Sequence, residues 1–375
     1  MQFSLPVYNQ PDFSREIFQN APDVSIGTVQ MDGVAPEQFH VTSMFPEYFK
    51  INGEWILPED SRMDCCVVPL TDKKLAVVEL RNLKKGDPVI LGRTDNGIDG
   101  IYIHTEGFQS QYIPGDSFAF RTGRSRETSF SQDYDTLYNL LMYERENGGN
   151  VLWVMGPACT FDADARASMQ YLIENGFVQG ILGGNALATH DLEAALFGTA
   201  LGQNIYTQKP HHNGHYYHID ILNRVRREGS IRKFIETYNI EDGIVESCVR
   251  NRIPMVLAGS IRDDGPLPEV IGDVYGAQDT MRALIQKATT VICMATQLHT
   301  IAVCNMTPSY RVINGVVRPL FIYSVDVTEF AVNKLLDRGS LSATGIITNA
   351  QDFIVLVAKG IQKKLDKTYS GGGQL

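Results

Sequence analysis

The sequence predicts an α/β protein in which a β-rich N-terminal domain precedes a domain built on a parallel sheet. Two observations support this prediction. Residues 39–120 carry short β-branched runs separated by Asn-Gly, Asp-Gly and Pro turns, which is typical of an all-β module. Beyond Val151, near-continuous apolar runs alternate with segments of helical spacing, which is typical of a parallel sheet covered on both faces.

The change of pattern sets the expected domain boundaries. We expect a β-rich domain over 1–125, a helical linker over 126–150, the α/β domain over 151–367 and a flexible tail over 368–375. A chain of 375 residues is long enough for two or three domains with a large hydrophobic core.

The composition argues against several classes of function. A net charge of -10 disfavours a nucleic-acid partner, because such binders rely on clustered Lys and Arg. No apolar run approaches the roughly 18 residues that a membrane span needs, and the N-terminus lacks a signal-peptide pattern. The six cysteines are scattered without CxxC spacing, so we expect reduced thiols in a cytoplasmic protein.

Small and polar residues follow the predicted strands of the α/β domain. These strand ends are Gly156-Pro157, Gly183-Gly184, Gly259-Ser260, Thr296 and Asp326. In a doubly wound, Rossmann-like sheet, ligands bind outside the carboxyl ends of the strands. We therefore expect a cofactor site at this edge, with the Asp326 carboxylate suited to ribose hydroxyls, although no GxGxxG, P-loop or HExxH motif is present.

The segment from Gly180 to Gly202 is the nearest substitute for such a motif. Gly183 and Gly184 allow close backbone approach, and Asn185, followed by Ala186, can hydrogen-bond a ribose or an amide. Thr189 is the predicted N-cap of the helix that follows. By this interpretation Asn185 precedes the helix.

The stretch "VLAGSIRDDGPLPEV" begins as an apolar strand and opens into Arg262, Asp263 and Asp264. Gly265 and two prolines restrict the backbone of the loop. The alternative is a solvated surface turn, but the neighbouring strand ends favour a functional site.

Four of the eight histidines lie in "HHNGHYYH", as His211, His212, His215 and His218. The tract predicts either a metal or charged-ligand loop or a polar loop before a helix. No carboxylate or thiol lies at ligand spacing, so we expect no metal. His299 follows a strand end, and both a site role and a buried hydrogen-bonded role stay open.

Several stretches resemble the archaeal-type ornithine cyclodeaminases, a group also known as the LOR/SDH conserved-domain family and found in the C-terminal half of cyanobacterial arginine dihydrolases. The resemblance covers about 35–357. Its most specific stretches are "GNALATHDLEAALFGTALG", "VLAGSIRDDGPLPEVIGDVYGAQDTMR", "ATQLHTIAVCNMTPS" and "APEQFHVTSMFPEYFKINGEWILPEDSRMDC".

The resemblance implies a Rossmann-like domain of the deoxyhypusine-synthase-like type, bound NAD and a homodimer or homotetramer. It implies conversion of L-ornithine to L-proline and ammonia, with the hydride borrowed and returned within one turnover. Asp263 and Asp264 would hold and deprotonate an amine, Arg262 would hold the carboxylate, and His215, His218 and Asn305 would contact the substrate. Which aspartate acts as the base stays open.

The chain departs from the family pattern at three places that bear on the substrate. Phe161 stands where the pattern has His, Tyr216 and Tyr217 replace Arg and His, and Cys304 replaces Gly. Such changes remove contacts of about 1.5 to 3 kcal/mol each, which is enough to alter substrate choice.

Two alternatives to the cyclodeaminase follow from these departures. One is an NAD-dependent oxidoreductase of amino acids or amines, or an aminoalkyl-transfer enzyme, acting on a different substrate. The other is a regulator that binds NAD and an amino acid without turnover. Net formation of NADH would indicate the dehydrogenase, whereas a cyclodeaminase forms none.

Overall fold

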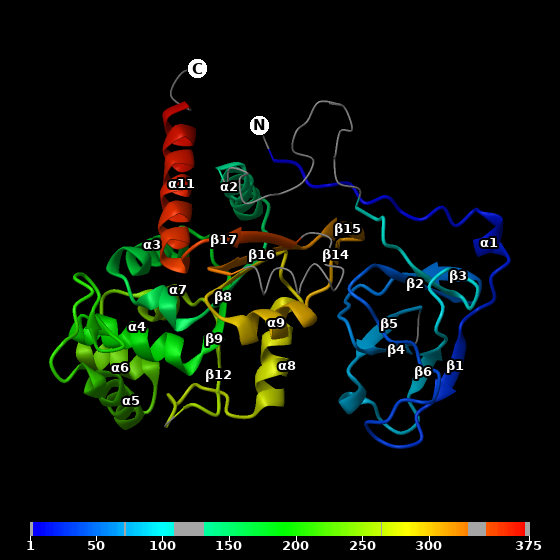
Figure 1. The fold of residues 1–375 in the computed structure, drawn as a ribbon. Coiled ribbons are helices and arrows are strands. Elements are labelled where there is room, and N and C mark those ends of the chain that lie inside the picture. The colour runs from blue at the N-terminus through cyan, green and yellow to red at the C-terminus, as the bar shows by residue number, and fades with distance from the viewer. Residues whose placement is uncertain (1–2, 71–72, 109–130, 264, 329–342, 372–375) are drawn as a thin grey trace.

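The computed structural model describes residues 3–70, 73–108, 131–263, 265–328 and 343–371. A β-rich unit and a larger α/β unit lie side by side (Figure 1). The fold class predicted from the sequence is confirmed.

The β-rich unit consists of small antiparallel sheets around two apolar clusters. Its described strands pair as β1 with β6, as β3-β2-β7 and as β4 with β5. Phe49, Val67, Ile90 and Ile101 form one of the clusters and are fully buried. The elements are α1 (Glu16–Gln19), β1 (Ser25–Thr28), β2 (Glu47–Ile51), β3 (Glu54–Ile56), β4 (Cys66–Pro69), β5 (Leu75–Val78), η1 (Leu80–Asn82), β6 (Pro88–Leu91) and β7 (Ile101–Ile103).

The α/β unit is built on a parallel sheet in the order β12-β9-β8-β13-β16-β17. Its strands are β8 (Val151–Met155), β9 (Gly180–Gly184), β12 (Met255–Ala258), β13 (Thr290–Met294), β16 (Phe321–Asp326) and β17 (Ala343–Ile347). The chain moves outward from β8 in one direction and then resumes at β13 in the other. The strand order therefore reverses between β8 and β13, which is where doubly wound sheets bind their ligands.

Helices cover both faces of this sheet (Figure 1). Val151, Trp153 and Met155 of β8 contribute to the core on one face, while Leu152 and Val154 contribute to the core on the other. The helices are α2 (Ser131–Glu146), α3 (Ala163–Glu174), α4 (Asn185–Phe197), α5 (Tyr217–Glu228), α6 (Ile231–Tyr238), α7 (Ile244–Asn251), α8 (Val274–Ile285), α9 (Gln297–Asn305) and α11 (Ala350–Gly371). Shorter elements are η2 (Pro157–Thr160), η3 (Gly214–Tyr216), β10 (Thr199–Ala200), β11 (Gln203–Asn204), β14 (Tyr310–Ile313) and β15 (Val316–Pro319).

Two segments are more deeply integrated than their sequence suggests. α2 lies within the segment predicted as a linker, yet its Leu137, Leu140 and Leu141 are fully buried in the core that also holds Trp153. α11 runs to Gly371, into the segment predicted as a flexible tail. Apolar burial of α2 joins it to the α/β unit.

The predicted start of α4 is wrong. The helix begins at Asn185, and Gly184, in an extended conformation (φ -108°, ψ 171°), occupies the N-cap position. Thr189 is buried within the helix, and its hydroxyl lies 3.4 Å from Asn185 Oδ1. Because β9 leads into α4 without a loop, Gly184 at the strand end takes the N-cap position, and no side chain caps the first N–H groups of the helix.

Charged side chains join the two units. Asp60 accepts hydrogen bonds from Arg311 (3.0 Å) and Arg282 (3.1 Å), and both guanidinium groups are buried. Tyr310 donates to the carbonyl of Pro58 at 2.8 Å. The β-rich unit is thereby held against the edge of the α/β unit formed by α8 and β14.

All six cysteines are buried. No helix within the described part of the chain is long and apolar enough to cross a membrane.

Candidate functional site

The carboxyl ends of β8, β9, β12 and β13 surround a cavity of about 490 Å³. It starts at the switch point of the sheet and runs along α4. The lining is Met155, Gly156, Pro157, Phe161, Gly184, Asn185, Ala186, Leu187, Thr189, His190, Leu201, His218, Ile219, Leu222, Ala258, Ser260, Arg262, Asp263, Thr296 and His299. This mixture of apolar walls with a few charged and polar groups is typical of a small-molecule site.

Close backbone packing shapes the switch point. A Cβ atom added to Gly156 would lie 1.8 Å from the carbonyl oxygen of Ala295, so only glycine fits there. Ala295 itself has a positive φ of 55°, a conformation that costs free energy for alanine and clusters at functional sites. A Cβ added to Gly183 would lie 2.7 Å from Leu187 Cδ2, and one added to Gly184 would lie 3.1 Å from His299 Cε1.

Two helices begin at this edge without a capping side chain. The N-cap positions of α4 and α9 are Gly184, which has no side chain, and Thr296, whose hydroxyl makes no capping hydrogen bond with a backbone N–H of α9. Free backbone N–H groups and the helix dipole attract negative charge. Together with the glycines at the strand ends, these helix N-termini fit the phosphates of a dinucleotide.

Asn185 has a structural contact as well as a place in the cavity wall. Its Oδ1 accepts a hydrogen bond from the backbone N–H of Leu267 at 3.0 Å, and its side chain is buried. This bond ties the start of α4 to the loop that follows β12. Asn185 therefore positions the charged loop.

That loop presents Arg262 and Asp263 to the cavity. The Asp263 carboxylate accepts from the N–H of Ser260 at 2.8 Å, and the hydroxyl of Ser260 accepts from the N–H of Arg262 at 3.0 Å. Neither charged side chain forms an ion pair with any other residue that the structure describes. Asp264 lies outside the described residues. Arg262 and Asp263 thus offer a cation and an anion from adjacent positions.

His299 lies over Gly184 at the start of α9. Its Nδ1 is 3.3 Å from Thr296 Oγ1. Burial lowers the pKa of His299 below its ordinary value of 6.5, so the ring is neutral at neutral pH. A neutral imidazole at this place can accept a proton or a hydrogen bond from a ligand.

The structure adds a buried pair that sequence reasoning missed. His190 Nδ1 is 2.8 Å from Glu193 Oε2, and both residues are buried on α4. The Glu193 carboxylate also accepts from Thr199 Oγ1 (2.9 Å) and from the N–H groups of Leu201 and Gly202 (both 3.1 Å). The available sequence signal was a Glu three residues after a His, spacing that places both on one helix face.

Two side chains from other elements face the His190 ring. The Phe161 ring, at the end of η2, lies 5.7 Å away in an edge-on arrangement, and the His218 ring from α5 lies 6.0 Å away. Burial is the main cause that lowers the pKa of His218, and the nearby His190 adds to it. Of the departures from the family pattern, Phe161 lines the cavity, whereas Tyr216 is exposed and Tyr217 stacks on Phe197.

The structure brings most of the predicted site residues together. The cavity wall includes Gly184, Asn185, Ala186, Ser260, Arg262, Asp263, Thr296, His299 and His218. The others lie elsewhere: Gly183 packs beneath the site, Gly259 against Gly272, His215 on Tyr216 at the surface, and Asn305 at the end of α9. Asp326, at the end of β16, accepts from the N–H of Thr328 at 3.1 Å.

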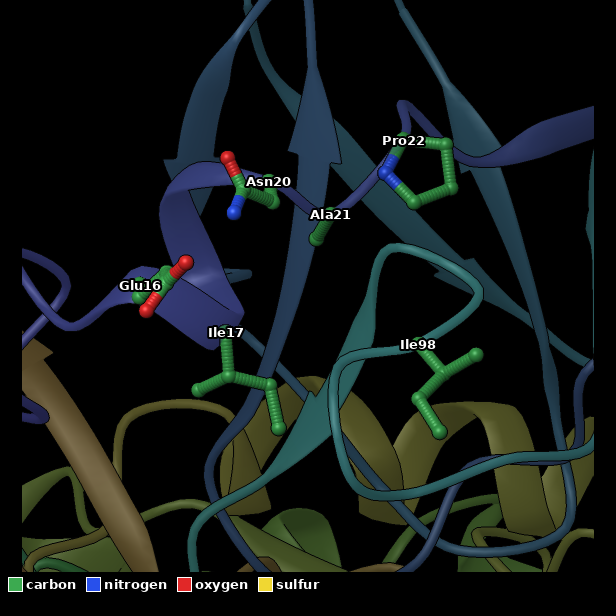
Figure 2. Close-up of a pocket in the computed structure, with 6 residues that line it drawn as sticks. All are labelled: Glu16, Ile17, Asn20, Ala21, Pro22 and Ile98. Atoms are coloured by element: carbon green, nitrogen blue, oxygen red, sulfur yellow. The ribbon is translucent and has the colours of Figure 1, made fainter.

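A smaller surface pocket of about 460 Å³ lies in the β-rich unit (Figure 2). Its side chains come from α1, from the segment after it and from Ile98 before β7. Behind it the Lys50 ammonium donates to the carbonyls of Phe18, Gln19 and Ala21 at 2.7 to 3.0 Å. These bonds satisfy the carbonyls at the end of α1, so the region reads as structural. Over the described ranges, no group of three or more His, Cys, Asp or Glu side chains has the arrangement of a metal site.

A doubly wound α/β domain with a polar cavity and uncapped helix N-termini at its switch point defines a Rossmann-type ligand-binding protein. Family models for the arginine dihydrolase ArgZ-like C-terminal region match residues 137–357 (Rossmann fold) and 46–124 (first region). The chain belongs to this ArgZ-like C-terminal family.

The relatives agree with this assignment and confirm the resemblance found in the sequence. An ornithine cyclodeaminase from Methanococcus maripaludis is 35% identical over 349 residues, which are 92% of this chain and 81% of that protein. The crystal structure of a conserved LOR/SDH protein from the same species has a TM-score of 0.82 at 34% identity, covering 92% of this chain and 99% of that one. The ternary complex of AgrE with ornithine and NAD+ has a TM-score of 0.57 at 32% identity, covering 93% of this chain and 47% of that one. AgrE of a Nostoc species is a bifunctional arginine dihydrolase/ornithine cyclodeaminase.

Proposed function

We propose that this protein is an NAD-dependent cyclodeaminase that converts L-ornithine, or a related basic amino acid, to L-proline or the corresponding cyclic imino acid and ammonia. The observation that carries the proposal is one cavity that joins a dinucleotide-type switch point to the charged side chains of Arg262 and Asp263. The relatives named ornithine cyclodeaminase and the AgrE complex support the choice of substrate and cofactor.

The residues at the sheet edge fit NAD. The N-termini of α4 and α9 would hold its phosphates. The small residues at this edge, Gly184, Ala186, Ser260 and Thr296, would let the cofactor approach the backbone closely. Asp326, at the end of β16, lies one strand further along the sheet and would bind a ribose. When bound, NAD supplies a hydride acceptor that later returns the hydride. Gly183 and Gly259 act from beneath by permitting close packing.

The charged groups divide the binding of a basic amino acid between them. Arg262 binds the carboxylate, and Asp263 or Asp264 holds and deprotonates the α-amine. His299 is neutral and offers a further acceptor beside the cofactor end of the site. The apolar residues Met155, Leu187 and Leu222 exclude water from the reacting atoms. His218 lies further along the cavity toward the side chain of the substrate, while His215 and Asn305 act from outside the wall.

A second candidate is an NAD-dependent oxidoreductase of a different amino acid. The observation that favours it is Phe161, an apolar ring in the cavity wall at a position where the family pattern has His. A binding protein without turnover would show NAD binding and no product.

The test is to incubate the purified protein with catalytic NAD and carbon-labelled L-ornithine and to follow labelled proline, ammonia and NADH. We expect proline and ammonia with no lasting NADH, and we expect Asp263→Asn to lose most of this activity. His212→Gln, an exposed histidine outside the cavity, is the matched control. Lasting NADH would favour the oxidoreductase, and bound NAD without any product would refute turnover of ornithine. We also propose that the protein is cytoplasmic and forms a homodimer or homotetramer. Sedimentation of the native protein measures the oligomeric state.

A further inference from the structure

We propose that His190 is a second proton-transfer residue of this site, which takes the proton from the side-chain amine of the substrate while Glu193 positions the His190 ring. This inference rests on the proposed function. In the proposed function, Arg262 and Asp263 on the loop after β12 bind the carboxylate and the α-amine of the substrate. His190, at the far end of the cavity, would take the proton from the second amine.

The hydrogen bonds around Glu193 determine which ring nitrogen is free. The buried carboxylate, when ionised, can only accept, and it receives donors from Thr199, Leu201 and Gly202 as well as from His190. The Leu201 N–H also lies 3.4 Å from His190 Nδ1, but its contact with Glu193 Oε2 is shorter, at 3.1 Å, so the carboxylate is its main acceptor. His190 therefore carries its proton on Nδ1, and Nε2 has the lone pair. Nε2 makes no hydrogen bond with another residue in the part of the chain that the structure describes.

The surrounding helices hold the His190 ring in place. Asp191, the next residue, accepts from Arg166 Nε at 2.9 Å and from the N–H of Val245 at 2.8 Å, and both Asp191 and Arg166 are buried. These contacts set the rotation of α4 against α3 and α7. His190 is consequently directed to the cavity side of the helix, where it lines the wall.

The position of His190 suits a distal amine. It lies five residues after Asn185 on α4, which is roughly 7.5 Å along the helix axis from the cofactor edge of the sheet. A substrate whose α-carbon lies at that edge carries its second amine on three methylene groups, and it extends along the same cavity toward His190. The α-amine and the distal amine therefore meet different protein groups.

The reaction needs two such groups. After the hydride has left Cα, the distal ammonium gives one proton to His190 Nε2, and the free amine attacks the carbon of the C=N bond. A new C–N bond forms, and the electron pair of the C=N bond moves to the α-nitrogen. That nitrogen takes up the proton that the ring nitrogen gives up. The bond between Cα and the α-nitrogen then breaks, ammonia leaves, and the electron pair of the ring nitrogen forms the C=N bond of the cyclic imine. The returned hydride converts the cyclic imine to the imino acid. Ornithine thus yields proline and ammonium with no net oxidation.

The groups that face His190 are Glu193 from its own helix, His218 from α5 and the neutral ring of Phe161 from η2. Burial lowers the pKa of His218, so this neighbour is neutral at neutral pH. The Glu193 carboxylate consequently stabilises the imidazolium that forms on His190, and the neighbouring His218 ring adds no charge.

The experiment compares the parent with His190→Gln, Glu193→Gln and the control His212→Gln. Rapid mixing with NAD and ornithine separates reduction of the cofactor from its reoxidation. We expect His190→Gln to keep the rate of reduction within a few-fold and to lose reoxidation and proline formation by about 100-fold or more. Higher pH should partly restore reoxidation in this variant, because the distal amine then loses its proton to solvent.

A measurement without cofactor tests the positioning role of Glu193. Spectra of ring-labelled histidine in the parent should show His190 protonated on Nδ1, and Glu193→Gln should change that tautomer. His190 protonated on Nε2 in the parent would overturn the inference even if the variants fold poorly. Parent-like reoxidation and proline formation in His190→Gln would also overturn it. Absence of cofactor reduction in the parent would instead refute the proposed function.

Discussion

Gly156→Ala should destabilise the protein and impair its cofactor site. Gly156 follows β8 at the switch point, with φ -89° and ψ 168°, a conformation that alanine adopts without strain. The added methyl group would nevertheless lie 1.8 Å from the carbonyl oxygen and 2.6 Å from the carbonyl carbon of Ala295. Both are backbone atoms of the segment that follows β13, so no side-chain rotation relieves the contact.

The structure sets the size of the effect. The ends of β8 and β13 would have to separate by roughly 1.5 Å before the contact became ordinary. Overpacking of this kind costs about 1 to 3 kcal/mol. Replacing glycine also reduces the conformational entropy of the unfolded chain, which stabilises the folded state by about 0.4 to 1 kcal/mol. We therefore expect a net loss of about 1 kcal/mol, and of at most about 2.5 kcal/mol, in the free energy of unfolding. A displacement near 1 Å at a reacting site costs about 100-fold in rate.

Urea unfolding measures the stability, and NAD titration with single-turnover kinetics measures the site. Gly272→Ala is the matched control, because a Cβ at Gly272 has no atom within 4 Å and its φ is not positive. The control should be as stable as the parent or slightly more so. If Gly156→Ala unfolds and binds NAD like Gly272→Ala, the argument from the packing of β8 and β13 is wrong.

Three further predictions concern charge, pH and thiol reactivity. Asp60→Ala removes the carboxylate shared by Arg282 and Arg311. Arg282 keeps its ion pair with Glu79 at 3.5 Å, but the buried Arg311 guanidinium loses the carboxylate that it contacts, so urea unfolding should show a loss of about 3 kcal/mol, and an unchanged midpoint would contradict the role given to this contact. Burial lowers the pKa of His299 in the folded state, so the unfolded chain binds a proton at His299 more readily. The contribution of His299 to the free energy of unfolding is therefore complete above about pH 6.5 and is lost as the pH falls through the folded-state pKa. Unfolding midpoints between about pH 7.5 and 5 should therefore fall less in His299→Gln than in the parent, and equal slopes would refute this. Burial raises the pKa of Cys159 to about 12, so alkylating reagents should leave this thiol unmodified until the protein unfolds, and mass spectrometry of the native protein checks it.

The sequence by itself determined the fold class and the edge of the sheet where the cavity lies. Apolar runs such as Val151–Met155 are buried on both faces, so their composition alone predicts parallel strands. Polar residues at strand ends are also a local signal, and Ser260, Thr296 and His299 indeed line one cavity. A local pattern suffices for these features because each depends on residues adjacent in the chain.

Tertiary structure alone decided the features that depend on contacts between distant segments. Thr189 resembled an N-cap, but the direct passage from β9 started α4 at Asn185. The sequence predicted a linker over the residues of α2, but the leucines of α2 pack into the core that also holds Trp153 of β8. The Glu193 carboxylate that contacts His190 also accepts from Thr199, Leu201 and Gly202, which surround it only when the chain turns back after α4. Backbone packing between Gly156 and Ala295 likewise requires two strands that become neighbours only in the folded sheet. Hydrogen-bond geometry and steric exclusion act through space, and the order of the residues does not specify them until the strands have paired.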